Sequence, residues 1–534
     1  MKPELRPGLA ARAAVVGLSF AFRAPELVHA REVNSDSAIV GLQAMHLAQG
    51  ELSAFLWGSG YQSAADAYWA VPFFGVLGPT PFALVLSALS LHVIATLALL
   101  SLGERHARLA RIENPAFAGA LLSLPLVFTT AAVHTYALFP PRQLAITLAL
   151  VGLALVDGAG ARARPHLHLA LGGGLSALAC AADPYALSFA PLAGLLVVLA
   201  ALDGPGGGSR VTFEKRALAG VARRLGAGGA GALAGALALV ALWRSDRAKL
   251  GVTSLDTSRF ERNLKLFTTE CGPWAFGSKS YYARHMMDYA PWEPPRAYTL
   301  FATGAACLFL ALFPAALLLA LTARNLPYAT RRAGVVGALA LPLGLAGFLT
   351  SVMVMDHFSM RYLASVPLLL PLALTPLLGT LGPRRLAAVL APVLVASGVS
   401  GWVSFGPDVR GPFIAPRAPG ATDEERAQVY LKERGVTYAM ADYWTAYRVS
   451  FVTAERLIVV PRHAAQDRYA PHRRAFAEQR RVAYLVDPLR TGESPDGVAE
   501  ELARGALLAP ATQTTRVTVG RLTVFVVDHG PPGL

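Results

Sequence analysis

The sequence predicts a polytopic α-helical membrane protein with about eleven transmembrane helices and a small extracytoplasmic α/β domain at the C-terminal end. Three observations predict it: repeated apolar runs, basic clusters in every second connection, and a change of character near residue 404. The 534-residue chain is 54% hydrophobic and only 15% charged. A soluble fold with this composition would expose more apolar surface than water tolerates.

The formal charge of +14 at pH 7 is typical of nucleic-acid-binding proteins. Here, however, the basic residues form short clusters between apolar runs, and no basic face interleaved with aromatic residues is present. This pattern indicates membrane topology signals, so we expect no nucleic-acid partner. The three cysteines show no metal-type spacing and predict no disulfide framework.

The apolar runs are long enough to cross a hydrocarbon core of about 30 Å, and many are rich in Gly and Ala, which suits close helix packing in a bilayer. The first is the weakest, because Arg23 interrupts it and Val28-His29-Ala30 is similar to a signal-peptidase site. A cleaved signal is therefore the alternative there. The predicted spans are 9–28, 76–101, 115–134, 137–157, 166–183, 186–202, 226–243, 298–322, 333–354, 362–380 and 386–403.

The connections between the spans predict the orientation. Basic clusters follow every even-numbered span, at 105–111, 162–164, 210–224, 324–332 and 384–385. The positive-inside rule places these clusters in the cytoplasm. The first external loop (30–75), the large loop 244–297 and the tail therefore lie outside, and we expect them on the outer face of a plasma membrane.

The tail has an ordinary soluble composition and predicts a second domain. We divide the chain into a transmembrane domain, 1–403, and a soluble domain, 404–534. Alternating patterns in the tail predict one helix and then strands: Glu424–Arg434, Val436–Met440, Leu457–Val460, Val482–Val486, Val517–Val519 and Leu522–Val527.

The first external loop carries the acids Glu32 and Asp36, an amphipathic helix from Ser37 to Ala48, and an aromatic segment that includes Trp57 and Tyr61. We expect this helix to lie along the membrane interface. Asp36 stands where the first span leaves the bilayer. It is a catalytic candidate, an ordinary loop acid, or a cap for the helix that follows.

This layout resembles the GT-C superfamily of membrane glycosyltransferases, and most closely family 39, which includes dolichyl-phosphate-mannose protein mannosyltransferases and bacterial lipid A aminoarabinose transferases. The segment Glu32-Val33-Asn34-Ser35-Asp36 matches the acid that this family places after its first helix. The segment Asp356-His357-Phe358-Ser359-Met360-Arg361-Tyr362 is similar to its entry into a late span, and Asp442-Tyr443-Trp444 lies in a similar external tail. The resemblance implies a polyprenyl-phosphate sugar donor and a site in the cell envelope of a bacterium, at its inner membrane.

One departure concerns metal ions. Many relatives carry a second acid in the next external loop, but residues 134–142 here contain His134, Tyr136 and Arg142 and no carboxylate. We therefore expect metal-independent chemistry with no cofactor and no metal ligand, and leave a divalent metal ion open.

The chemistry that the resemblance implies suits these residue types. A carboxylate can deprotonate an acceptor hydroxyl, a role we give to Asp36, with Glu32 as the next candidate. Arginine matches two phosphate oxygens at once, so Arg361 and Arg142 are the expected phosphate ligands, unless they only anchor helix ends at lipid headgroups. Further candidates are His357 for phosphate, and Tyr61, Tyr136, Asp356 and Tyr362 for substrate.

The function predicted is an inverting glycosyltransferase that moves a sugar from a polyprenyl-phosphate carrier to an extracytoplasmic lipid, glycan or protein, with membrane lipids around it. A transporter or flippase of lipid-linked sugars, and a polysaccharide polymerase or ligase, are the alternatives. Transporters usually keep polar residues at the membrane midplane and show repeated halves, whereas here the acids gather at one face and no repeat is evident.

Overall fold

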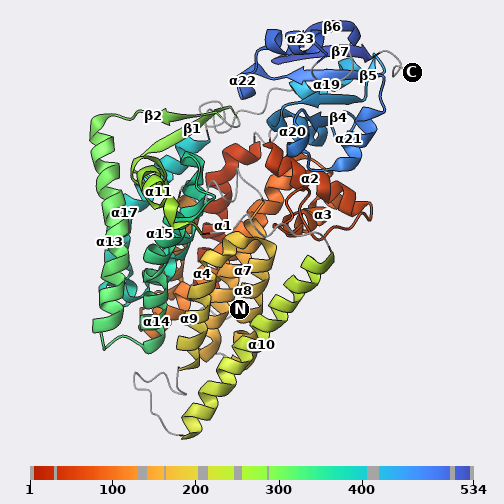
Figure 1. The fold of residues 1–534 in the computed structure, drawn as a ribbon. Helices are drawn as coiled ribbons and strands as arrows, with labels where there is room; N and C mark the ends of the chain where they lie inside the picture. Colours follow the sequence, from red (N-terminus) through yellow and green to blue (C-terminus); the bar gives the residue numbers. More distant parts are fainter. Residues whose placement is uncertain are drawn as a thin grey trace.

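The computed structural model describes residues 5–28, 33–129, 141–161, 164–202, 215–245, 255–285, 288–405, 420–505 and 511–529. The chain is mostly helical, with a helical bundle, a small mixed sheet at the C-terminal end, and between them a layer that we call the external layer because it lies outside the bundle (Figure 1). The bundle helices are α1 (Leu5–Val28), α4 (Pro81–Leu109), α5 (Pro115–Phe128), α7 (Gln143–Gly158), α8 (Pro165–Ala182), α9 (Ala190–Ala201), α10 (Lys215–Ser245), α13 (Arg296–Thr322), α14 (Tyr328–Ala338), α15 (Ala340–Thr350), α16 (Ser365–Ala373) and α17 (Thr375–Ser404).

These helices occupy the apolar stretches that the sequence predicted as spans. By length and composition, four described segments could cross a membrane: Pro81–Leu109, Arg296–Thr322, Tyr328–Thr350 and Thr375–Ser404. The last one is interrupted at Gly382, whose φ of 73° and ψ of 165° are not helical. It therefore corresponds to parts of two predicted spans, 362–380 and 386–403. Several spans are thus supported, and the number eleven stays a prediction.

Close helix packing in the bundle follows from small residues, as the sequence predicted. The clearest case is the contact of α8 with α10. A Cβ added to Gly231 would lie 1.9 Å from the carbonyl oxygen of Ala170, and one added to Gly235 would lie 2.6 Å from that of Gly174. Any larger side chain would push these two helices apart.

The connection between α13 and α14 lies at the end of the bundle opposite the C-terminal domain (Figure 1). This connection begins one of the predicted cytoplasmic clusters, 324–332. The arrangement agrees with the predicted sidedness, because a basic connection and the soluble domain lie at opposite ends. The orientation in a membrane stays a prediction.

The C-terminal domain contains the predicted helix and five strands, and also four helices that the sequence analysis did not predict, α20 to α23. In chain order its elements are α19 (Asp423–Lys432), β3 (Tyr438–Ala441), α20 (Tyr443–Val452), β4 (Ile458–Pro461), α21 (Ala470–Ala477), β5 (Arg481–Val486), α22 (Pro488–Thr491), α23 (Pro495–Ala503), β6 (Ala511–Val519) and β7 (Leu522–His529). The strand order is β4-β3-β5-β7-β6, with β4, β3 and β5 parallel and the last two antiparallel. Helices cover both faces of the parallel strands, which explains their continuous apolar sequences.

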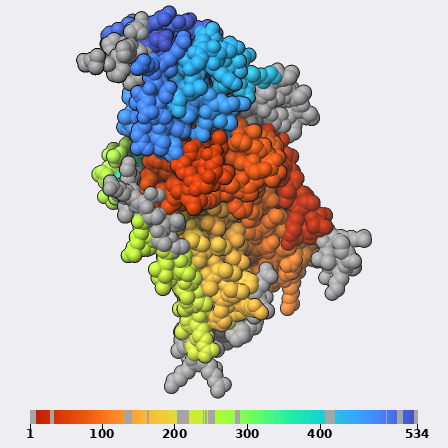
Figure 2. Space-filling model, turned by 90° about the vertical axis from the view of Figure 1, so that its right-hand side faces the viewer, coloured from red at the N-terminus to blue at the C-terminus, as the bar shows by residue number. Residues whose placement is uncertain are grey.

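The external layer joins this domain to the bundle. It includes α2 (Ser35–Ala48), α3 (Ala65–Leu77), α11 (Phe260–Leu266), the hairpin of β1 (Ser280–His285) with β2 (Asp288–Trp292), and the 3₁₀ segment η7 (His357–Leu363). Figure 2 shows the C-terminal domain seated directly on the part of this layer formed by α2 and α3.

The position of α2 corrects the sequence analysis, which expected a helix along the membrane interface. Most of α2 is buried, with Ile39 and Leu42 in a core shared with Tyr447 and Phe451 of α20. Apolar residues occur around the whole circumference of α2 rather than on one face, and such a helix is stable only when it is covered by protein.

Candidate active site

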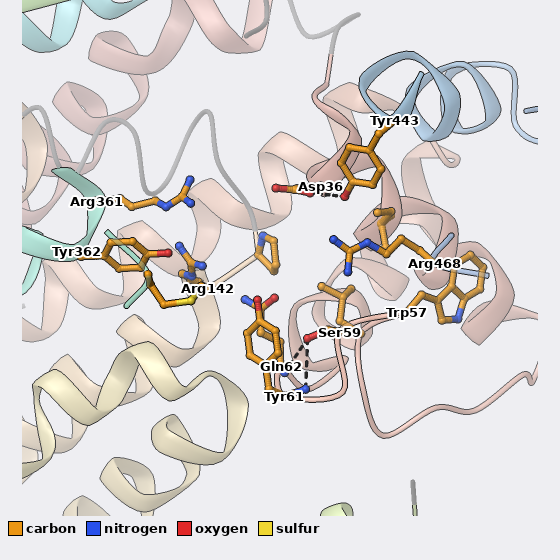
Figure 3. Close-up of a pocket in the computed structure, with 14 residues that line it drawn as sticks. Asp36, Trp57, Ser59, Tyr61, Gln62, Arg142, Arg361, Tyr362, Tyr443 and Arg468 are labelled. Carbon is orange, nitrogen blue, oxygen red and sulfur yellow. Dashed lines mark hydrogen bonds between the residues drawn. The ribbon is translucent and has the colours of Figure 1, made fainter. Parts of the chain in front are cut away.

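A cavity of about 110 Å³ lies in the external layer where the C-terminal domain meets the bundle (Figure 3). Side chains from α2, the following loop, the start of α7, η7 and the C-terminal domain line it. Its polar lining residues are Asp36, Ser59, Tyr61, Gln62, Arg142, Arg361, Tyr362, Tyr443 and Arg468. The fold therefore brings Asp36 together with four other residues that the sequence predicted for the site: Tyr61, Arg142, Arg361 and Tyr362.

Asp36 lies in the first turn of α2 but does not cap it. The cap is Asn34, whose side-chain oxygen accepts a hydrogen bond from the backbone N–H of Ser37 at 2.8 Å. The Asp36 Oδ1 instead accepts a hydrogen bond from the Tyr443 hydroxyl at 2.5 Å. Burial, and then the charge of Asp36, hold the pKa of Tyr443 above its usual range, so this hydroxyl stays a donor.

Arg142 directly precedes α7 and is held in place by Asp183. Its Nε donates to Asp183 Oδ2 at 3.2 Å, and the same oxygen accepts a hydrogen bond from Gln62 at 2.5 Å. Asp183 Oδ1 also accepts a hydrogen bond from the backbone N–H of Tyr185, so the same side chain caps the short 3₁₀ helix Pro184–Ser188. The φ of Arg142 is 149°, a conformation that non-glycine residues rarely adopt. Such strain is tolerated mainly where surrounding contacts hold a functional side chain.

Asp66 on α3 stabilises the start of α7, next to Arg142. Its Oδ1 accepts a hydrogen bond from the backbone N–H of Leu144 at 3.0 Å, so an acid from α3 caps the start of α7 beside Arg142. Burial raises the pKa of Asp66 to about 6.

Arg361 lies on η7, and its guanidinium carbon is 5.2 Å from the centre of the Tyr362 ring. The Tyr185 hydroxyl donates to the Arg361 carbonyl at 3.1 Å, which fixes the backbone. The buried Nε of Arg361 has no hydrogen-bond partner among the described residues. A buried donor of this kind is available to an anionic ligand.

Arg468 was not predicted from the sequence, although it supplies a third guanidinium. It donates from Nη1 to the Gly58 carbonyl at 3.1 Å, and its guanidinium carbon lies 5.5 Å from the centre of the Tyr443 ring. Burial alone would lower the pKa of Arg468, but Tyr443 and Asp36 raise it overall. Gly58 has a φ of 66°, and a Cβ there would lie 2.5 Å from the Arg468 side chain. The glycine at position 58 is thus a sequence feature that fits this close contact.

The remaining predicted residues lie elsewhere. His357 is outside the cavity lining and stacks on Tyr281, with ring centres 5.1 Å apart. Burial lowers the pKa of His357. Asp356 is exposed and forms a capping box with Ser359 at the start of η7. Glu32 and Tyr136 fall outside the described residues.

Positive side chains outnumber negative ones in the cavity lining, with three arginines and one carboxylate. Figure 3 shows Arg361 and Arg142 on one side, Arg468 on the other, and Asp36 between them. Of the three guanidinium groups, only that of Arg142 pairs with a described carboxylate, Asp183. The cavity is therefore suited to an anion next to a single carboxylate that can act as a base.

No protein-family model matches the chain, and no curated protein matches its sequence. Solved structures with a similar layout include the oligosaccharyltransferase AglB from Archaeoglobus fulgidus in complex with an inhibitory peptide and a dolichol-phosphate, at 11% identity and a TM-score of 0.46, covering 90% of this chain and 70% of that one. ArnT from Cupriavidus metallidurans bound to undecaprenyl phosphate is similar at 13% identity and a TM-score of 0.44, covering 98% and 99%. The arabinofuranosyltransferase AftD from Mycobacteria is similar at 14% identity and a TM-score of 0.47, covering 98% and 42%. Since each of these TM-scores is below 0.5, function must be argued from the residues of this chain.

Proposed function

We propose that this protein is an inverting glycosyltransferase that takes a sugar from a polyprenyl-phosphate donor and transfers it to an acceptor on the extracytoplasmic side of the membrane. The observation that carries the proposal is the convergence of one carboxylate and three guanidinium groups on one cavity, from parts of the chain far apart in sequence. Tyr443 and Arg468 of the C-terminal domain line the cavity, and that domain lies at one end of the bundle (Figure 1).

The proposed reaction has one displacement step. Asp36 accepts the proton of the acceptor hydroxyl, whose oxygen attacks the anomeric carbon of the sugar from the face opposite the phosphate. A new carbon–oxygen bond forms, the bond from the anomeric carbon to the phosphate oxygen breaks, and its electron pair leaves with the lipid phosphate. The configuration at the anomeric carbon is inverted.

The arginines act on the leaving group. Negative charge grows on the departing phosphate as the bond breaks, so preorganised donors stabilise the transition state more than the ground state. Arg361 and Arg468 are the natural ligands, because the buried Nε of each has no hydrogen-bond partner among the described residues. Arg142 adds a third positive charge, whose position is set by Asp183.

The test is incubation of purified protein with labelled polyprenyl-phosphate sugars, scored for loss of the lipid-linked label. We expect cleavage by the wild-type protein and a loss of about 10²–10⁴-fold in rate for Asp36→Asn, because the amide cannot accept the proton. Glu293→Gln is the matched control, because this exposed acid lies outside the cavity. If the protein instead moved the intact lipid-linked sugar from one leaflet of a vesicle membrane to the other, without cleaving it, the result would favour a flippase.

Arg361→Lys separates phosphate binding from membrane anchoring. Lysine is an adequate headgroup anchor but lacks the planar fork that binds two phosphate oxygens. We expect normal insertion and a loss of about 10²–10³-fold in turnover. Arg296→Lys, at the exposed start of α13, is the control for a simple anchor. Wild-type turnover in Arg361→Lys would return Arg361 to an anchoring role.

A further inference from the structure

A second polar cluster lies outside the cavity, between the first external loop and the C-terminal domain. It consists of His46 near the end of α2, Glu455 in the turn between α20 and β4, and His472 on α21. Glu455 Oε1 is 3.0 Å from Nε2 of His46 and 3.1 Å from Nε2 of His472. One ligand atom from each residue lies within 4.8 Å of the other two.

These distances suit a tetrahedral metal ion. Zinc binds histidine nitrogen and carboxylate oxygen at about 2.0–2.2 Å, which places neighbouring ligand atoms of a tetrahedron about 3.3 Å apart. Two of the separations are within a few tenths of an ångström of that value, so only small side-chain movements would admit the ion. The three side chains are mostly covered, with exposed fractions of 14% for His46, 17% for Glu455 and 9% for His472.

The surroundings of His46 supply a second, independent observation. Its other ring nitrogen, Nδ1, lies 2.6 Å from Glu51 Oε2, and Glu51 in turn accepts a hydrogen bond from the Tyr469 hydroxyl at 2.8 Å. Metal-binding histidines commonly donate their second N–H to a carboxylate, which sets the tautomer and points the free nitrogen at the metal. Here that arrangement directs Nε2 of His46 toward Glu455.

The turn that carries Glu455 is strained. Ala454 and Glu455 have φ values of 48° and 58°, so two successive non-glycine residues adopt the left-handed conformation. Strain of this kind is unfavourable and persists only where the surrounding structure holds the backbone in place. The direction held here brings the Glu455 carboxylate between two imidazoles.

We propose that His46, Glu455 and His472 bind one zinc ion, with water in the fourth position, and that this ion clamps the C-terminal domain onto α2. The ligand set of two histidines and one carboxylate is one that zinc accepts. None of the three residues lines the cavity, so the site is separate from the proposed catalytic centre. The inference does not depend on the proposed function.

The clamp has a consequence for the cavity. His46 is ten residues from Asp36 along α2, which is about 15 Å of helix. Tyr443 and Arg468 reach the cavity from the same domain that supplies Glu455 and His472. Zinc binding would therefore stabilise the docked position in which Tyr443 contacts Asp36.

The test uses the purified full-length protein without a polyhistidine tag, stripped with a chelator and then titrated with Zn²⁺ alone. We expect one tightly bound zinc per chain by elemental analysis, and a melting temperature that rises with zinc. Glu455→Gln and His472→Ala should lose both effects. His463→Ala is the matched control, because His463 is an exposed histidine in the same domain.

Two results would overturn the proposal. One is the absence of saturable zinc binding by the wild-type protein. The cluster would then be only an ion-pair network, in which two imidazoles contact one carboxylate. The other is equal binding by wild type and Glu455→Gln. If His472→Ala fails to fold, Glu455→Gln still decides, because it keeps the shape of the side chain. Metal content is measured without reference to sugar transfer, so failure of the proposed function would not affect this result.

Discussion

Replacing Gly41 with leucine tests whether docking of the C-terminal domain builds the cavity. Gly41 lies in the middle of α2, where Phe451 of α20 packs directly against its backbone. A Cβ added there would lie 2.4 Å from the nearest ring carbon of Phe451, where an ordinary contact is 3.4 Å or longer. Phe451 is fully buried and stacks on Phe74, so its ring has no open space to enter.

The magnitude follows from this overlap. The ring would have to move by about 1 Å for the Cβ alone, and overpacking of this kind costs about 1–3 kcal/mol. Replacing a helical glycine recovers about 1 kcal/mol of helix propensity, but the three further carbons of leucine have no space either. The Cβ alone therefore leaves a net destabilisation of up to about 2 kcal/mol at this interface, and the remaining carbons of leucine add to it, so we expect α20 to be displaced.

Displacement of α20 separates Tyr443 from Asp36, so Gly41→Leu should lower both the melting temperature and the rate of sugar transfer. The matched control is Gly75→Leu on α3, where an added Cβ would meet nothing within 4 Å. The double variant Gly41→Leu/Phe451→Ala removes the ring and should recover part of both losses. Wild-type activity and stability in Gly41→Leu would refute the view that a docked C-terminal domain completes the site.

Three further predictions concern charged residues. Arg468→Lys keeps the charge but loses the planar fork, so we expect turnover to fall about 10²–10³-fold with a normally folded domain; an unchanged rate would remove Arg468 from the anion-binding set. Burial raises the pKa of Asp66 to about 6, so the folded state binds more protons than the unfolded state between pH 4 and 6, and stability should fall as pH rises through this window. Melting curves of wild type and Asp66→Asn should converge at low pH and separate above pH 6, and parallel curves would contradict the assignment. Asp157→Asn leaves the buried Arg332 and the half-buried Arg105 without their carboxylate, which should cost about 3–5 kcal/mol and lower the melting temperature sharply; an unaltered melting temperature would show that the pairing contributes little.

The sequence by itself determined the helical bundle and the strands of the tail. Both depend on local patterns: an apolar run of sufficient length becomes a buried helix, and short β-rich runs between turns become strands. The basic connections were also recognisable, although Arg105 and Arg332 prove to pair with Asp157 rather than simply face lipid headgroups. Among the residues that line the cavity, Asp36 was predicted from the family resemblance, and Arg142 and Arg361 were predicted because guanidinium groups match phosphate oxygens.

Only the tertiary structure decided the rest of the site. Tyr443 lies 407 residues from Asp36 in sequence, and Arg468 lies 410 residues from Gly58. The contact of His46 with Glu455 spans 409 residues. Each of these residues looks like an ordinary member of its own helix or loop, because hydrophobic period and charge clustering carry information over only a few turns. What brings them together is the burial of α2 beneath α20, which depends on the absence of a side chain at Gly41 and the shape of Phe451 opposite it.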